Sequence, residues 1–114
     1  MSDPYRVLWH PAAREDFAPL DAVTVDTLVR SAHDRLARAP QHFGQPLKGT
    51  THLLWRMRWG DYRLVYTIRQ ASREVWVLGS QRRDIVYRAS HLQRLTRLAA
   101  ALHHHPSAFR GHQI

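Results

Sequence analysis

Two neighbouring runs of alternating residues, separated by Gly60-Asp61, constrain the fold more than any other feature of this sequence. Residues 53–59 and 62–69 are rich in Trp, Tyr, Val and Ile, which favour strands. A Gly that opens a two-residue connection is typical of a β-hairpin turn, and such a turn fixes the register. The predicted opposed pairs are Trp59 and Tyr62, Arg58 and Arg63, Met57 and Leu64, Arg56 and Val65, and Trp55 and Tyr66.

The predicted register gives the hairpin two chemically different faces, because opposed residues share a face. One face carries core material, namely Trp55, Met57, Trp59, Tyr62, Leu64, Tyr66 and Ile68. The other face gathers Arg56, Arg58 and Arg63. Opposed like charges repel each other, so this second face predicts an anionic ligand, with a solvated outer face as the alternative.

The rest of the sequence predicts one α+β domain in the order β-α-α-β-β-β-α. Its antiparallel meander sheet has two N-terminal helices packed on one face, and a C-terminal helix follows. Asp21 is the predicted cap of the second helix, and Ser90 with Gln93 forms a capping box for the last. We expect the domain to span residues 1–102 and residues 103–114 to be a disordered His-containing tail. The predicted strands are 5–9, 53–59, 62–69 and 74–80; the predicted helices are 11–18, 21–39 and 90–102; residues 41–49 form a loop.

Charge is divided unevenly along the 114 residues, whose formal net charge is +8. Residues 1–43 hold five arginines and six acids, a net charge of −1, whereas residues 44–114 hold Lys48 and eleven arginines against three acids, a net charge of +9. Such asymmetry predicts an anionic partner, either nucleic acid, an acidic protein or an anionic membrane surface.

Several classes of protein are not expected from the composition. No apolar run approaches the roughly 20 residues of a membrane helix, and the first residues lack the apolar segment of a signal peptide. The sequence has no cysteine, which excludes disulfides and thiolate sites. These features suit a protein of the cytoplasm.

The third predicted strand leads into further basic residues and a phenol. Arg82, Arg83 and Tyr87 follow it closely, so we expect a phosphate clamp with a stacking platform beside the hairpin arginines. The carboxylates of this half lie in turns or at strand ends, which argues against a two-metal nuclease. Adjacent histidines at 103–105 point in different directions on a helix. No metal site is therefore expected.

Four motifs carry a resemblance to a known family. They are PLKG at residues 46–49, LWRMR at 54–58, GDYRLVY at 60–66 and QRRDIVYR at 81–88. Together they resemble the RelE/ParE toxin superfamily of bacterial type II toxin–antitoxin pairs, over about residues 4–100. The resemblance implies the same order of strands and helices as the one expected above.

Similarity to the RelE branch implies a ribosome-dependent mRNA endoribonuclease that needs no metal or other cofactor. It would enter the ribosomal A site, where a ribose 2′-hydroxyl of the mRNA attacks the neighbouring phosphate. Its other implied partner is a cognate antitoxin protein. Residues that match the catalytic positions of this branch are Arg56, Arg58, Arg63, Arg82 and Tyr87; the neighbouring Lys48, Arg83 and Arg88 are expected to bind RNA.

Two points of this correspondence stay open. If residues are counted back from Tyr87, the catalytic position assigned to Arg82 could instead be held by Gln81 or by Arg83. The two basic residues of the second strand, Arg56 and Arg58, are arginines where the branch usually has lysines. A guanidinium with a pKa above about 12 does not readily act as a general base. We therefore expect Arg58 to act by its charge alone.

The ParE branch offers a rival function. Its members bind DNA gyrase and stall it, which requires no catalytic residues. They generally lack the basic strand pair and the terminal tyrosine, which this sequence has as Arg56, Arg58 and Tyr87. The motifs therefore favour the nuclease, with the gyrase inhibitor as the alternative and an inert or RNA-binding relic of a toxin locus as a third class.

Overall fold

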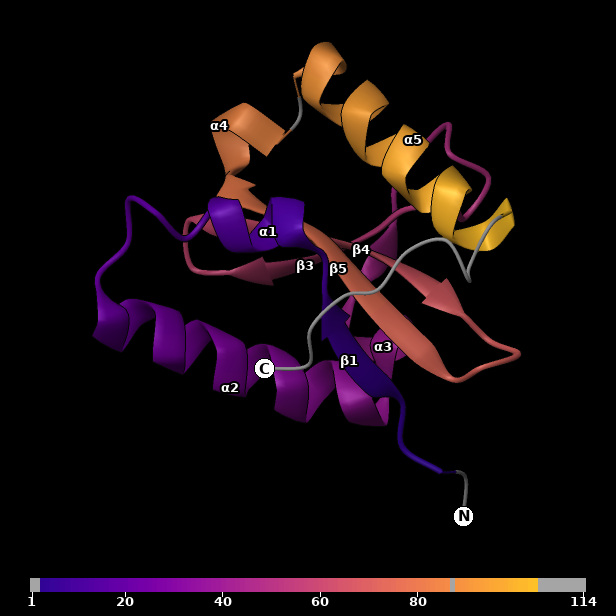
Figure 1. The fold of residues 1–114 in the computed structure, drawn as a ribbon, viewed down its shortest axis with the longest axis horizontal. Coiled ribbons are helices and arrows are strands. Elements are labelled where there is room, and N and C mark those ends of the chain that lie inside the picture. Colours follow the sequence, from indigo (N-terminus) through magenta and orange to yellow (C-terminus); the bar gives the residue numbers. More distant parts are fainter. Residues whose placement is uncertain (1–2, 87, 105–114) are drawn as a thin grey trace.

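The computed structural model describes residues 3–86 and 88–104, and its elements follow the predicted order with three short additions. Figure 1 shows the sheet between α2 on one side and α5 on the other. The elements are β1 (Arg6–Trp9), α1 (Pro11–Glu15), α2 (Ala22–Arg38), α3 (Pro40–Phe43), β2 (Gln45–Pro46), β3 (Trp55–Trp59), β4 (Tyr62–Arg69), β5 (Glu74–Arg82), α4 (Arg83–Val86) and α5 (Ala89–His104).

The sheet contains the predicted antiparallel meander, and its order is β1-β5-β4-β3-β2. All five predicted pairs of the β3–β4 hairpin are confirmed, from Trp59 opposite Tyr62 to Trp55 opposite Tyr66. Strand β1 pairs in parallel with β5, and this pairing ends at Trp9 opposite Val77. The chain beyond β1 turns into α1, so the later part of β5 has no β1 residue beside it.

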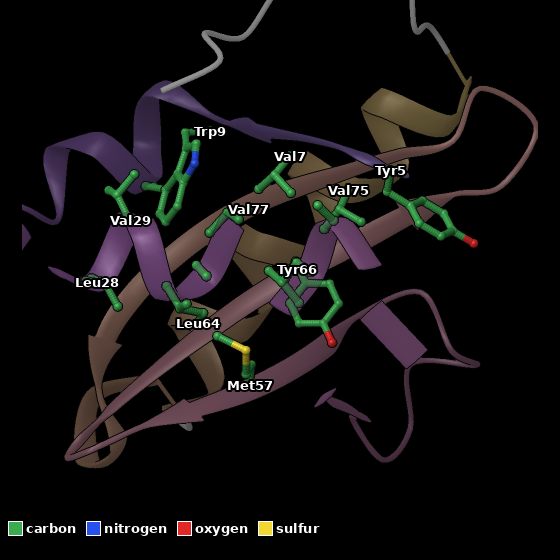
Figure 2. Packing of buried hydrophobic residues seen from close by; sticks show 14 residues of the cluster. Tyr5, Val7, Trp9, Leu28, Val29, Met57, Leu64, Tyr66, Val75 and Val77 are labelled. Atoms are coloured by element: carbon green, nitrogen blue, oxygen red, sulfur yellow. The ribbon is translucent and has the colours of Figure 1, made fainter. Parts of the chain in front are cut away.

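Helix α2 covers the face of the sheet that the alternation marked as core. Leu28, Ala32 and Leu36 of α2 are fully buried against it, together with Ala13 of α1. The predicted packing of both N-terminal helices on one face is thereby confirmed. The sheet residues of this core include Val7, Trp9, Met57, Leu64, Tyr66, Val75 and Val77 (Figure 2).

Helix α5 covers the opposite face through a second core. Leu95, Ala99 and Leu102 of α5 pack there on Val65 and Leu78. Leu78 falls between the β5 partners of Val65 and Tyr66, where the β4–β5 register is shifted. This bulge moves every later residue of β5 by one position relative to β4.

Helix caps explain where the first helices begin. The side chain of His10 accepts a hydrogen bond from the Ala12 N–H, and Asp21 accepts one from the Thr24 N–H, as predicted for Asp21. The helix predicted over residues 11–18 is shorter in the structure, where α1 ends at Glu15. Pro40 ends α2 but also opens the single turn of α3, inside a stretch that the sequence predicts to be loop.

The boundaries of α5 differ from those predicted. The helix begins at Ala89, so Ser90 lies inside its first turn and is not the cap. It continues past the predicted end at Leu102 to His104. Residues 105–114, the rest of the predicted tail, lie outside the described residues. The short elements β2 and α4 were not predicted, since two and four residues carry no periodic pattern.

Candidate functional site

The basic face predicted for the hairpin lies on the same side of the sheet as α5. Arg56 and Arg58 of β3 and Arg63 of β4 alternate with residues of the α2 core, and Arg58 stands directly opposite Arg63. Across the other edge of β4, the residue opposite Arg63 is Gln81 of β5. The structure therefore places three guanidiniums and one carboxamide on one face, since opposed residues share a face.

Arg63 differs from its two neighbours because it is buried. Only 6% of the residue is exposed, whereas Arg58 is exposed and Arg56 is half-buried. Its Nη1 donates to the carbonyl oxygens of Gly60 at 3.1 Å and Tyr62 at 2.9 Å, and its Nε has no hydrogen-bond partner. No carboxylate in residues 3–86 and 88–104 forms an ion pair with it. A buried cation with a spare donor can still bind an anion.

A hollow of about 730 Å³ adjoins Arg56. It lies between the segment around β2 and the α5 residue Leu92, and the exposed Lys48 lines it. Arg56 also donates from Nη2 to the side-chain oxygen of Gln45 at 3.0 Å. The other lining residues are Pro46, Leu47 and Thr50. Two cationic side chains, Lys48 and Arg56, therefore line one hollow.

One of the remaining predicted site residues, Arg82, is not brought to this face. Arg82 stands opposite Tyr62, one position on from Gln81, so it belongs to the opposite face, and it pairs with Asp84 at 3.8 Å. Arg83 begins α4, and Arg88 precedes α5; both are exposed. Tyr87 lies outside the described residues. The position beside Arg63 is thus held by Gln81, one of the alternatives that the motif count left open.

Asp16, which sequence analysis did not single out, contacts the site from the end of α1. Its Oδ2 accepts a hydrogen bond from the Ser80 N–H at 2.9 Å, and its Oδ1 accepts one from Gln81 Nε2 at 2.6 Å. Burial raises the pKa of Asp16, although these hydrogen bonds and the charges of His91 and Arg94 act to lower it. No motif marks this carboxylate, because its partners lie 64 and 65 positions away in the sequence.

His91 of α5 lies beside the same part of β5. Its Nε2 is buried, has no hydrogen-bond partner and lies 3.6 Å from the place that a Cβ on Gly79 would occupy. Burial lowers the pKa of His91, the Asp16 carboxylate acts to raise it, and Arg94 adds to the lowering. Gly79 therefore lets the α5 imidazole approach the strand closely.

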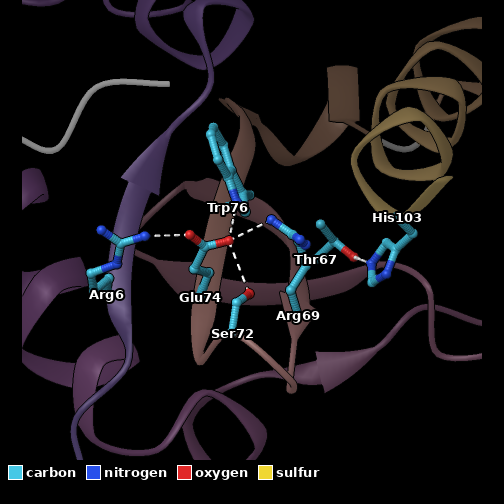
Figure 3. Close-up of polar contacts among 7 residues, drawn as sticks. All are labelled: Arg6, Thr67, Arg69, Ser72, Glu74, Trp76 and His103. Atoms are coloured by element: carbon cyan, nitrogen blue, oxygen red, sulfur yellow. Dashed lines mark hydrogen bonds and ion pairs between the residues drawn. The ribbon is translucent and has the colours of Figure 1, made fainter. Parts of the chain in front are cut away.

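A second polar cluster lies at the other end of this face (Figure 3). The buried Glu74 binds Arg6 and Arg69 and accepts hydrogen bonds from Ser72 and from Trp76 Nε1. Burial acts to raise the pKa of Glu74, but these hydrogen bonds and the charge of Arg69 outweigh it and lower the pKa. This cluster joins β1, β4 and β5, and its members are hydrogen-bonded to one another.

The described residues can also be compared with what a metal site and a membrane helix require. Between residues 3 and 104, Tyr87 aside, no group of three or more His, Cys, Asp or Glu side chains could hold a metal ion. In the same part of the chain, no helix combines the length and apolar character needed to cross a membrane.

Comparison with known families decides the classification. The family model described as "ParE toxin of type II toxin-antitoxin system, parDE" matches residues 7–85, which is more than half of the chain. The chain belongs to the RelE/ParE toxin superfamily. The resemblance found in the sequence is thereby confirmed, and the protein is a toxin of the type II toxin–antitoxin class. A search of curated proteins finds no match to this toxin.

Solved structures agree with this classification of the toxin. A chain of the RelBE2 toxin–antitoxin complex from Mycobacterium tuberculosis is 30% identical, with a TM-score of 0.66 and coverage of 73% of this chain and 95% of that one. The archaeal RelE–RelB complex from Pyrococcus horikoshii is similar at 26% identity, a TM-score of 0.58 and coverage of 72% and 98%. A mutant E. coli RelE in the free state, 15% identical over 83% and 97% with a TM-score of 0.63, shows the shared fold alone.

Proposed function

We propose that this toxin is an endoribonuclease that enters the ribosomal A site in the cytoplasm, cuts mRNA there and so inhibits translation. The observation that carries the proposal is Arg63, a buried guanidinium with an unpartnered Nε and no carboxylate partner among the described residues. Arg58 and Arg56 flank it on the same face. This arrangement suits an anion, and the phosphate of RNA is one.

The chemistry needs charge stabilisation more than it needs a metal. When the ribose 2′-hydroxyl attacks the adjacent phosphorus, its proton passes to solvent water and negative charge builds on the phosphorane oxygens. The bond from phosphorus to the 5′-oxygen then breaks, and this oxygen takes a proton from water, which leaves a 2′,3′-cyclic phosphate. Arg63 and Arg56 would stabilise that charge, and Arg58 would hold the phosphate by its own charge. Because Arg63 is only 6% exposed, RNA would have to displace side chains that cover it.

Other basic residues would hold the message rather than act on it. Lys48 at the 730 Å³ hollow, with Arg83 and Arg88 before α5, would contact phosphates away from the cut. Tyr87 would stack on a base, as the resemblance to the RelE branch implies. Arg82, which lies on the opposite face, has no place in this arrangement.

A cognate antitoxin is the second proposed partner. Two similar structures are toxin–antitoxin complexes, RelBE2 and archaeal RelE–RelB. An acidic or amphipathic antitoxin segment would neutralise the basic face or displace α5. Either route blocks access of mRNA to the arginines.

The match to the ParE family model favours a second candidate, inhibition of DNA gyrase. The deciding experiment gives the purified toxin to a translation extract and to a gyrase supercoiling reaction in parallel. We expect primer extension to show cuts within codons, unchanged by chelator, while supercoiling continues. An exposed arginine on α2, changed as Arg30→Ala, serves as the control and should keep full cleavage. An intact message together with blocked supercoiling would reject the nuclease in favour of the gyrase inhibitor.

A further inference from the structure

The carboxylate of Asp16 occupies an open edge of the sheet. Strand β1 pairs with β5 only as far as Val77, so the Ser80 N–H beyond it has no strand partner on that side. Asp16 Oδ2 accepts this N–H at 2.9 Å, which completes the hydrogen bonding of β5 next to the site.

The same carboxylate fixes which way the Gln81 amide points. An ionised carboxylate only accepts hydrogen bonds, so the group 2.6 Å from Asp16 Oδ1 must be the NH₂ of Gln81. The carboxamide oxygen Oε1 is then turned away from Asp16. Strand β4 lies along the other edge of β5, and there Arg63 is the residue opposite Gln81.

Three residues from distant parts of the chain thus form one row across the sheet. Asp16 lies on one side of Gln81, and Arg63 lies on the other. The row therefore places Gln81, whose Oε1 is turned away from Asp16, opposite Arg63, whose buried Nε has no hydrogen-bond partner. An acceptor beside a cation suits a ligand that carries both a hydroxyl and an anionic group, as a ribose 2′-hydroxyl next to its 3′-phosphate does.

We propose that Asp16 is a positioning residue that holds the Gln81 amide so that Oε1 accepts a hydrogen bond from the ribose 2′-hydroxyl. This inference rests on the proposed nuclease function and extends it. DNA lacks that hydroxyl, so the Asp16–Gln81 pair makes the site selective for RNA. Because an amide is not a base, Gln81 orients the hydroxyl and takes no proton from it.

The substitution Asp16→Asn tests this orientation without changing the shape of the side chain. The Ser80 N–H can only donate, so the introduced carboxamide must turn its oxygen towards Ser80 and its NH₂ towards Gln81. The Gln81 amide then flips: its Oε1 accepts from the introduced NH₂, and its own NH₂ faces Arg63. The neighbouring Glu15→Gln, whose carboxylate is exposed and 3.9 Å from Arg94, is the matched control.

The experiment measures single-turnover cleavage of mRNA on ribosomes by a double-mutant cycle. We expect Asp16→Asn and Gln81→Ala each to lower the cleavage rate by about tenfold, the effect of losing one hydrogen bond to a charged or reacting group. The double variant should be no slower than Gln81→Ala, whereas Glu15→Gln should cut at the wild-type rate.

Thermal unfolding of each variant separates positioning from folding. Asp16→Asn should melt within a few degrees of the wild type, and the side-chain amide signals of Gln81 should move in the ¹⁵N spectrum. Unchanged cleavage by Asp16→Asn, or losses that multiply in the double variant, would overturn the role of Asp16. Absence of cleavage by the wild-type chain would overturn the proposed function, and this inference with it.

Discussion

Two arginines of β4 lie on the same face of the sheet and at opposite ends of it, yet their surroundings differ. Arg69 contacts the buried carboxylate of Glu74, which also binds Arg6 (Figure 3). Arg63 is more deeply buried but has two carbonyl oxygens in place of a carboxylate, with its Nε unpartnered. The first arginine is neutralised within the fold, whereas no carboxylate among the residues that the structure describes pairs with the second.

The difference predicts a structural role for the charge of Arg69 and a functional role for that of Arg63. A buried ion pair that loses one partner leaves the other charge uncompensated and destabilises the fold. A buried cation without a carboxylate partner already bears that cost, so its removal should not destabilise the fold but should abolish the binding of its ligand. Stability and activity should therefore respond in opposite ways at the two ends of β4.

Substitution of the two arginines by methionine should have the largest effect. Arg63→Met should lower ribosome-dependent mRNA cleavage by about 10²–10³-fold, because a donor aimed at transition-state charge is lost. Its free energy of unfolding should be equal to that of the wild type or higher. Arg69→Met should keep cleavage and lower the unfolding free energy. Cleavage assays and urea denaturation check both, and persistent growth arrest by Arg63→Met would contradict the comparison.

Glu74→Gln should have the next largest effect, on stability alone. It weakens the charged contacts to Arg6 and Arg69 and should lower the free energy of unfolding by about 2 kcal/mol at neutral pH. The pKa of Glu74 is lowered in the folded state, so its contribution is present above the unfolded value of 4.5 and is lost as the pH falls through the folded value. Denaturation at several pH values should show that the free energy of unfolding of the variant falls less steeply towards acid pH than that of the wild type. If both fall equally, other carboxylates cause the decline.

Arg58→Ala should have a smaller effect, on binding. Arg58 is exposed and stands opposite Arg63, so it contributes charge to the site without being needed for packing. We expect affinity for ribosomes to fall severalfold and the salt dependence of binding to lose about one unit of slope. Binding measured over a range of salt concentrations checks this. An unchanged slope would place Arg58 outside the phosphate contacts.

The smallest effect should come from the contact that holds the end of α5 near Glu74. His103 Nε2 and Thr67 Oγ1 lie 2.8 Å apart, and burial, Arg69 and His104 all lower the pKa of His103. The lowered pKa stabilises the fold above the unfolded value of 6.5, and this stabilisation is lost as the pH falls. Thr67→Val should lower stability by about 0.5–1 kcal/mol at pH 8, and by less at pH 5. Equal losses at both pH values would contradict a role for the neutral imidazole.

The sequence predicted those parts of the fold and site that depend on local patterns. The Gly60-Asp61 turn fixes the register of β3 and β4, so the shared face of Arg56, Arg58 and Arg63 follows from turn chemistry and alternation alone. The cap at Asp21 and the buried stripe of α2 follow likewise from neighbouring residues. The family also followed from short motifs, of which GDYRLVY is the most distinctive.

What the sequence could not predict depends on contacts between distant segments. The motif count left Gln81, Arg82 and Arg83 as alternatives for one position, because no local pattern marks the bulge at Leu78 that sets the register of β5. The carboxylates show the same limit: Glu74 and Asp16 differ in their partners, which fold onto them from up to 68 positions away.

By itself, then, the sequence determined the order of the elements, the hairpin register and the basic face, since turn chemistry and alternation act over a few residues. Only the tertiary structure decided which arginine is neutralised and which is not. It also brought Asp16 to Gln81 and placed Gln81 beside Arg63. Burial and charge compensation are properties of the packed molecule, because they depend on which distant side chains exclude water from a group and which of them reach it.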